Sequence, residues 1–103
     1  MPRWLSRALT RIRTCAIERK VLFTLKALRE LALLDLDEDD ACDIMASLRA
    51  ADSTGRIRSA TTHEWMYLFK PQYSETTLYL KLILRSDCIV ISFHEDEDDQ
   101  EEI

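Results

Sequence analysis

The spacing of apolar residues changes once along this chain, between residues 52 and 55, and this change constrains the fold more than any other feature. Before it, apolar residues recur at steps of three and four, which is typical of one face of an α-helix. After it, apolar and polar residues alternate, which is typical of strands with one buried face. Helices followed by strands predict an α+β domain, with N-terminal helices packed on a C-terminal antiparallel sheet.

Three helices are expected within residues 3–51. The first covers residues 3–16, and its apolar stripe consists of Trp4, Leu5, Ala8, Leu9, Ile12, Cys15 and Ala16. The hydroxyl of Thr24 can cap the start of the second helix. The acidic run 37–40 fits the start of the third, because the helix dipole favours negative charge there. Residues 20–23, between the first two helices, are compatible with a short strand.

Four strands are expected, at residues 56–62, 64–70, 77–85 and 89–94. The last two form a hairpin, and only one register matches apolar with apolar side chains, because a slip of one residue would set leucines against polar residues. This register pairs Leu84–Ile89, Leu82–Ile91 and Leu80–Phe93 on the apolar face, and Lys81–Ser92 and Tyr79–His94 on the polar face. We expect nearly complete burial of Leu80, Leu82, Ile91 and Phe93.

The length of 103 residues fits one domain, which we expect to span residues 1–94 and to be followed by an acidic flexible tail at 95–103. The net charge of -5 conceals a segregation of charge. Residues 1–34 contain eight Lys or Arg against two Glu, whereas the last nine residues contain seven acids and no base. A basic N-terminal third is compatible with a polyanionic partner despite the acidic total.

Composition excludes several classes of protein. No apolar run approaches the roughly 20 residues of a membrane span, so no membrane association is expected. The three cysteines are scattered, which favours reduced thiols and a cytoplasmic location. With Gly55 as the only glycine, a Gly-rich phosphate-binding loop is not possible, and no cofactor or metal site is indicated.

The polar face of the predicted hairpin suggests a site for RNA cleavage without a metal ion. Such cleavage needs a base for the 2′-OH proton, cations for the charge on phosphorus and an acid for the departing 5′-oxygen. Tyr79 and His94 can serve the proton transfers, with Arg58 sharing the face if its strand lies nearby. Lys81 can bind phosphate, and His63 is a further candidate for RNA contact, although a turn position favours a simple exposed residue.

The C-terminal half resembles the MqsR family of toxin–antitoxin ribonucleases. The resemblance is carried by residues 59–62, 65–71, 78–82 and 87–93, and more loosely by the acidic run before residues 41–44. It implies a RelE-like fold, a ribosome-independent endoribonuclease acting on mRNA, and a cognate antitoxin protein that neutralises it.

The resemblance also implies roles for single residues. The family's sheet tyrosine falls on Tyr79, and its lysine before the Thr-Thr pair falls on Arg58, which keeps the charge but does not deprotonate. Lys70 stands for an arginine before proline and would bind substrate. Met66 replaces a catalytic glutamine, and His94 replaces a lysine and supplies an acid–base group. We interpret the chain as an active, divergent member.

Two other classes of function remain open. A solvated antiparallel sheet often carries Tyr, Lys and Ser without any catalytic role, so the chain is also compatible with a non-catalytic nucleic-acid-binding module. Alternatively, the stripe of Arg3, Arg7 and Arg11 or the acidic tail is a docking surface of a protein-interaction module. The tail itself either maintains solubility or competes with RNA phosphate for Arg58 and Lys81. The sequence predicts neither the oligomeric state nor the cleavage motif.

Overall fold

The computed structural model describes residues 1–97 and has an α+β architecture, as the sequence predicted. The first apolar stripe forms helix α1 (Arg3–Ile17), which begins directly after Pro2. The helix buries one face of small and branched side chains: Leu5, Ala8, Leu9, Ile12 and Ala16. No helix in residues 1–97 is both long and apolar enough to cross a membrane.

The next two helices begin where the sequence predicted, at Thr24 and at the acidic run 37–40. Helix α2 (Leu25–Leu33) starts at Thr24, whose hydroxyl accepts a hydrogen bond of 3.1 Å from the Ala27 N–H. Helix α3 (Glu38–Ala46) starts at a capping box, in which Asp37 and Asp40 each accept a hydrogen bond from the other's backbone N–H. The acidic run is therefore a helix start, and a short 3-10 helix, η1 (Ala50–Asp52), leads on to the sheet.

The sheet has six strands, of which the longest are β5 (Thr76–Leu84) and β6 (Cys88–Glu95). The others are β1 (Val21–Phe23), β2 (Ser53–Arg58), β3 (Trp65–Phe69) and β4 (Gln72–Tyr73). Their order is β1-β6-β5-β3-β2, with β4 paired to β5 beside this path. Strand β2 contains a bulge between Ser53 and Gly55, and the φ of 116° at Gly55 is accessible to glycine without strain.

Two features of the sheet differ from the prediction. The sheet is mixed, because β1 pairs in parallel with β6, whereas the other neighbouring strands are antiparallel. The short segment 21–23 gave no signal for its partner, and the chain passes from it directly into α2. Strand β4 was not predicted, because it follows Pro71, a residue that usually ends a strand, and consists of only two residues.

The β5–β6 hairpin keeps the predicted register on one side of a β-bulge and loses it on the other. Tyr79–His94, Leu80–Phe93 and Lys81–Ser92 pair as expected. Beyond Lys81 the register shifts by one, so Leu82 pairs with Val90 and the predicted pairs with Ile91 and Ile89 are wrong. Ile91 is the additional residue of the bulge and is only partly buried.

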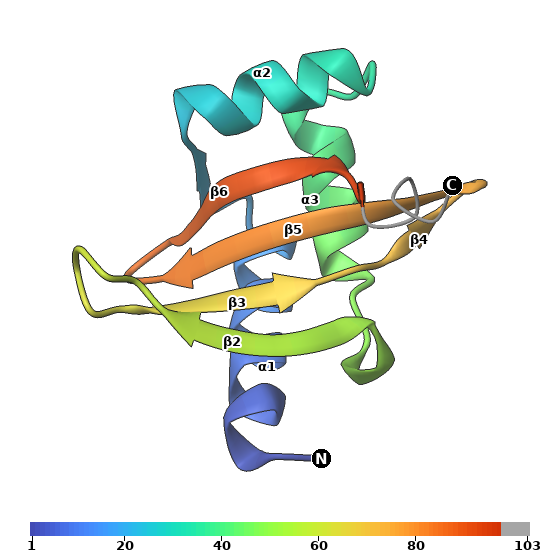
Figure 1. Ribbon diagram of the computed structural model, residues 1–103. Helices are drawn as coiled ribbons and strands as arrows, with labels where there is room; N and C mark the ends of the chain where they lie inside the picture. Colours follow the sequence, from blue (N-terminus) through green and yellow to red (C-terminus); the bar gives the residue numbers. More distant parts are fainter. Residues whose placement is uncertain (98–103) are drawn as a thin grey trace.

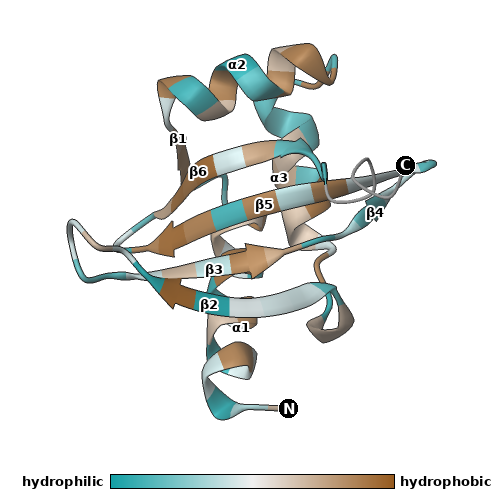
Figure 2. Ribbon diagram, viewed as in Figure 1, coloured by the Kyte–Doolittle hydropathy of each residue, from teal (hydrophilic) through white to brown (hydrophobic). Residues whose placement is uncertain are grey.

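The helices cover one face of the sheet and one of its edges. In Figure 1, α1 and α3 lie behind the strands, and α2 runs beside β6. The core lies between the sheet and the helices, and Leu80, Leu82 and Phe93 are completely buried there, as predicted. Figure 2 shows the hydrophobic and hydrophilic segments that alternate along β5. We call the opposite face, which carries Tyr79, Lys81 and His94, the open face.

The folded region extends past the predicted boundary at residue 94. Strand β6 includes Glu95, and the Asp96 N–H donates a hydrogen bond of 2.8 Å to the Thr77 carbonyl. The Asp96 side chain is buried and forms an ion pair with Lys70. The first residues of the acidic segment therefore belong to the domain. The remainder of the proposed tail, residues 98–103, lies outside the described residues.

Candidate functional site on the open face

Tyr79 and His94 form the centre of the open face. They are paired across the β5–β6 hairpin, and their rings are stacked with centroids 5.1 Å apart and planes inclined by 27°. His94 Nδ1 lies 2.8 Å from the Glu95 carbonyl oxygen. Because a carbonyl oxygen only accepts, Nδ1 must carry a proton, and Nε2 is the ring nitrogen left to exchange protons with a ligand.

Lysine side chains lie on both sides of this stacked pair. Lys81 is two residues after Tyr79 on β5, so it lies on the same face of the sheet, and it is half-buried. Lys70 follows Phe69, which is aligned with Leu80, so the alternation of the strand places Lys70 on the face of Tyr79. The structure therefore brings together four predicted site residues, namely Tyr79, His94, Lys81 and Lys70.

Lys70 is also in contact with an acidic residue of the C-terminal segment. Its Nζ lies 3.4 Å from Asp96 Oδ2, and both side chains are largely shielded from solvent. The sequence analysis proposed that the acidic tail competes with RNA phosphate for Arg58 and Lys81. The cation that Asp96 contacts is instead Lys70. Asp96 of the acidic segment thus lies beside Lys70, on the same face of the sheet as Tyr79 and His94.

Helix α2 contributes two residues that sequence analysis missed. Lys26 Nζ donates to Ser92 Oγ at 3.0 Å and to Glu30 Oε2 at 2.8 Å. Glu30 Oε1 accepts from the Phe93 N–H at 2.9 Å, directly before His94. The four-residue spacing of Lys26 and Glu30 was a visible signal of an ion pair, but its position beside β6 depends on the parallel β1–β6 pairing.

The charge on Glu30 is maintained by these contacts. Burial opposes its ionisation, but the hydrogen bonds from Lys26 and Phe93, together with attraction to Lys26 and His94, lower the pKa of Glu30. An ionised Glu30 holds Lys26 over Ser92, which pairs with Lys81 on the neighbouring strand. Lys26 and Lys81 therefore both lie next to Ser92, two residues before His94 in β6.

Arg58 and His63 lie elsewhere, which corrects the prediction that Arg58 shares the face of Tyr79. Arg58 is paired with Trp65, and its guanidinium carbon lies 4.1 Å from the Trp65 ring centroid. Trp65, Tyr67 and Phe69 alternate on the face covered by α1, as their apolar pattern predicted. His63 is exposed in the β2–β3 loop with a φ of 64°, and its carbonyl accepts a hydrogen bond from Arg58.

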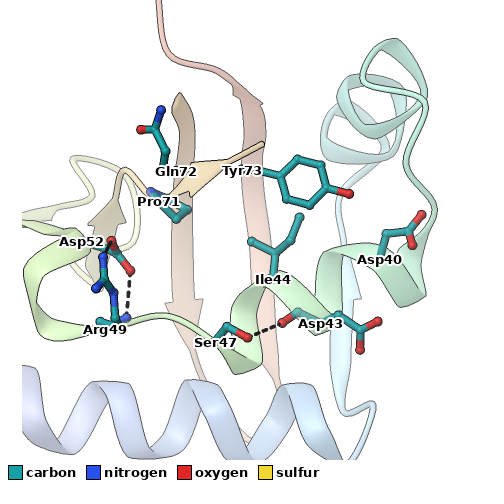
Figure 3. Close-up of a pocket in the computed structure, with 9 residues that line it drawn as sticks. All are labelled: Asp40, Asp43, Ile44, Ser47, Arg49, Asp52, Pro71, Gln72 and Tyr73. Carbon is teal, nitrogen blue, oxygen red and sulfur yellow. Dashed lines mark hydrogen bonds and ion pairs between the residues drawn. The ribbon is translucent and has the colours of Figure 1, made fainter. Parts of the chain in front are cut away.

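A separate hollow of about 430 Å³ lies between α3, η1 and β4. Its lining is shown in Figure 3: Asp40, Asp43, Ile44, Ser47, Arg49, Asp52, Pro71, Gln72 and Tyr73. Two interactions within it connect lining residues to each other, Arg49 to Asp52 and the Ser47 hydroxyl to the Asp43 carbonyl. None of the predicted site residues lines this hollow.

Burial disfavours the nucleophilic thiolate form of two cysteines, because it raises the pKa of Cys42 and of Cys88. Cys42 and Cys88 are buried and free, and Cys15 is free and partly buried. Burial raises the pKa of Cys88 to about 12, so its reactive thiolate form is disfavoured. Among residues 1–97, no three His, Cys, Asp or Glu side chains gather where they could hold a metal ion.

Comparison with known proteins agrees with the resemblance found in the sequence. A family model described as "Motility quorum-sensing regulator, toxin of MqsA" matches residues 6–95, which is nearly the whole described chain. No curated protein matches the chain at a significant level. The match covers α1 from residue 6 onward, helices α2 and α3, and strands β1 to β6, including Tyr79 and His94. The chain belongs to the MqsR toxin family, the toxins of toxin–antitoxin pairs.

Proposed function

We propose that this toxin is an mRNA endoribonuclease and that its active site is the open face around His94. The observation that carries the proposal is the stacked pair of Tyr79 and His94, in which Nδ1 is held by a backbone carbonyl and Nε2 remains for proton transfer. A histidine with one fixed nitrogen is well suited to acid–base chemistry near neutral pH. This function would place the protein in the cytoplasm, where mRNA is translated.

The proposed reaction uses the 2′-hydroxyl of the substrate. As the proton of this hydroxyl leaves, the 2′-oxygen bonds to phosphorus, and the bond between phosphorus and the 5′-oxygen breaks. His94, as the imidazolium, gives the proton on Nε2 to the departing 5′-oxygen, and the 2′-OH proton passes to a water molecule, either directly or through the Tyr79 hydroxyl. The products are a 2′,3′-cyclic phosphate and a 5′-hydroxyl. The acid of this reaction is thus the His94 side chain.

Cations on the open face would stabilise the phosphate as negative charge develops. Lys81 is paired with Ser92 across the β5–β6 hairpin, and Lys26 donates a hydrogen bond to the Ser92 hydroxyl. Ser92 is two residues before His94. Lysine is a compact donor that binds phosphate oxygens as a point charge. Lys70 stands on the other side of Tyr79, where Asp96 already neutralises part of its charge. Lys26 is likewise paired with Glu30, so Lys81 is the principal phosphate ligand of this proposal.

The partner we propose is a cognate antitoxin that either covers the open face or competes with RNA for it. The family name describes a toxin paired with an antitoxin. Expression of the toxin alone should arrest growth, and co-expression with the antitoxin should restore it. If the toxin is harmless alone and purifies without a partner in its native host, the antitoxin part of the proposal is wrong.

The direct test is to incubate the purified protein with a structured mRNA and map the ends of the fragments. We expect 5′-hydroxyl and 2′,3′-cyclic phosphate ends, undiminished cleavage in EDTA, and no cleavage where the attacking nucleotide lacks its 2′-OH. RNA binding without any cut would instead select the non-catalytic nucleic-acid-binding module. Failure to bind RNA would select a protein-interaction module.

A further inference from the structure

The opposite face of the sheet carries a second, unexpected arrangement of aromatic and cationic groups. The guanidinium carbon of Arg56 lies 4.6 Å from the Trp4 ring centroid and 3.8 Å from that of Trp65. Arg58 lies 4.1 Å from the same Trp65 ring. We call Trp4, Arg56, Trp65 and Arg58 the Arg–Trp stack. It joins the N-terminal end of α1 to the edge strand β2 and to β3.

The stack is built on a rigid part of the fold but reaches the surface. Trp4 packs against the hydrophobic core and lies 5.8 Å from Tyr67, measured between ring centroids. Trp4, Arg56 and Trp65 are partly buried, whereas Arg58 is exposed. Flat side chains are therefore held in a fixed orientation, with an accessible end at Arg58.

Within the part of the chain that the structure describes, the positive charge of the stack has no counterion. Among residues 1–97, no carboxylate lies within 4.0 Å of a basic group of Arg56 or Arg58, and the same holds for Arg3 and Arg7. Arg7 lies one helical turn from Trp4, and Arg3 is its neighbour in sequence, so these arginines flank the stack. In a protein of net charge -5, such a local excess of cations favours an anionic ligand.

We propose that the Arg–Trp stack binds unpaired bases of single-stranded RNA, with the flanking arginines on the phosphates. Aromatic rings and guanidinium planes are the groups on which proteins stack splayed-out bases, and they do so with little sequence preference. The inference rests on the proposed function in taking RNA as the ligand. It adds a second contact on the other side of the sheet from Tyr79 and His94, which would hold the strand outside the segment that is cut.

The chain offers a direct optical probe of this site, because Trp4 and Trp65 are its only tryptophans. A single-stranded oligonucleotide carrying 2′-O-methyl groups binds but cannot undergo 2′-OH attack. We expect it to quench tryptophan fluorescence in parallel with the anisotropy rise of the labelled oligonucleotide. Binding seen by anisotropy at saturation, with unchanged tryptophan emission, would overturn the proposal. Quenching by an antitoxin but not by RNA would also overturn it and assign the stack to the protein partner.

Substitutions separate stacking from charge. The double variant Arg56→Lys and Arg58→Lys keeps both charges but loses the planar groups, and it should bind the oligonucleotide about 2- to 5-fold more weakly, which is the cation–π contribution converted at 1.4 kcal/mol per tenfold. Arg29→Lys, an exposed arginine on α2, is the matched control and should leave affinity unchanged. Equal affinities in all three proteins would overturn the role of the guanidinium planes. Circular dichroism checks that the fold is intact.

The outcomes distinguish this inference from the proposed function. Cleavage of unmodified RNA without tryptophan quenching would leave the ribonuclease proposal standing and remove the stack. Quenching and the predicted loss in the lysine variant, without any cleavage, would leave the stack standing and remove the ribonuclease proposal. Absence of both binding and cleavage would overturn the two together.

Discussion

The two faces of the sheet combine aromatic and cationic groups in different ways. On the open face, Tyr79 is stacked on His94, and an imidazole ring can both accept and donate a proton. On the face next to α1, the tryptophans of the Arg–Trp stack contact arginines, whose guanidinium groups do not serve as acids or bases in proteins. The first arrangement is suited to chemistry and the second to binding.

This difference teaches that proximity of an aromatic ring and a cation does not by itself identify an active site. What separates the two is the presence of a group that changes protonation and the way it is held. The contact of His94 Nδ1 with the Glu95 carbonyl orients the ring, whereas Arg58, at the end of β2, donates to the His63 carbonyl in an exposed loop. The following variants test whether the two faces differ in function as they do in chemistry.

The largest expected effect concerns the proton-transferring group. His94→Ala should lower the cleavage rate at saturating RNA by about 10²–10⁴-fold, the usual contribution of one acid–base group, while RNA affinity is largely retained. Arg58→Ala should instead weaken RNA binding and its salt dependence more than it slows the cut. Single-turnover cleavage and anisotropy titrations measure the two quantities separately. Wild-type cleavage by His94→Ala would make this histidine a bystander.

Tyr79→Phe sharpens the same experiment, because it removes the hydroxyl and keeps the ring. If the hydroxyl assists at the 2′-OH, the variant should cleave more slowly with unchanged affinity. If the ring serves only as a surface for His94 or for a base, Tyr79→Phe should resemble the wild type, and Tyr79→Ala should lose affinity.

The second prediction concerns the layer that supports both faces. Leu82 is completely buried in the middle of β5, so Leu82→Ala should reduce the free energy of unfolding by about 2–5 kcal/mol. Leu33, which is 87% exposed on α2, is the matched control, and Leu33→Ala should change stability by less than about 0.5 kcal/mol. Urea denaturation followed by circular dichroism measures both. A similar cost for the two leucines would contradict the position of the core.

The smallest effect concerns the anchor of the open face. The pKa of Glu30 is lowered in the folded state, so its carboxylate stabilises the fold above the unfolded pKa of about 4.3, and this contribution disappears as pH falls through the lower folded value. Glu30→Gln should therefore cost about 1 kcal/mol at pH 7 and progressively less below pH 4.3.

The exposed pair of Glu18 and Lys20 provides the control for this comparison. Its charged atoms are 3.5 Å apart and open to solvent, so Glu18→Gln should have little effect on stability at either pH. Denaturation curves at pH 7 and pH 3.5 suffice for both variants. A loss in Glu30→Gln that does not depend on pH would show that shape rather than charge matters at this position.

The sequence was informative where local patterns decide the structure. The Thr24 cap and the acidic start of the third helix follow from side-chain chemistry. The centre of the site follows from the alternation of the strands, because a slip of the β5–β6 hairpin would expose leucines. The bulge could not be foreseen for a physical reason. Residues 89–91 are Ile, Val and Ile, so an additional residue there exchanges one apolar side chain for another and leaves no mark in the pattern.

Features that depend on distant partners were beyond the sequence. The position of Arg58 required the β2–β3 register, which pairs it with Trp65 and hence with the helix-covered face. Lys26 and Glu30 joined the site only through the packing of α2 beside β6, where the Thr24 N–H donates to the Val90 carbonyl. In both places the local sequence is compatible with a simple exposed surface, so tertiary packing alone decides the outcome.

The parallel pairing of β1 with β6 also has a consequence for how the chain folds. Thr24 and Ile91, which are hydrogen-bonded at the end of this pairing, are 67 positions apart in sequence. Closing so long a loop costs more entropy than forming a hairpin, and contacts between distant residues slow folding. The β2–β3 and β5–β6 hairpins can form early, whereas Lys26 and Glu30 reach His94 only when this late contact closes. The Tyr79–His94 pair within the β5–β6 hairpin would thus form before Lys26 and Glu30 join it, and the open face would be completed only in the last step of folding.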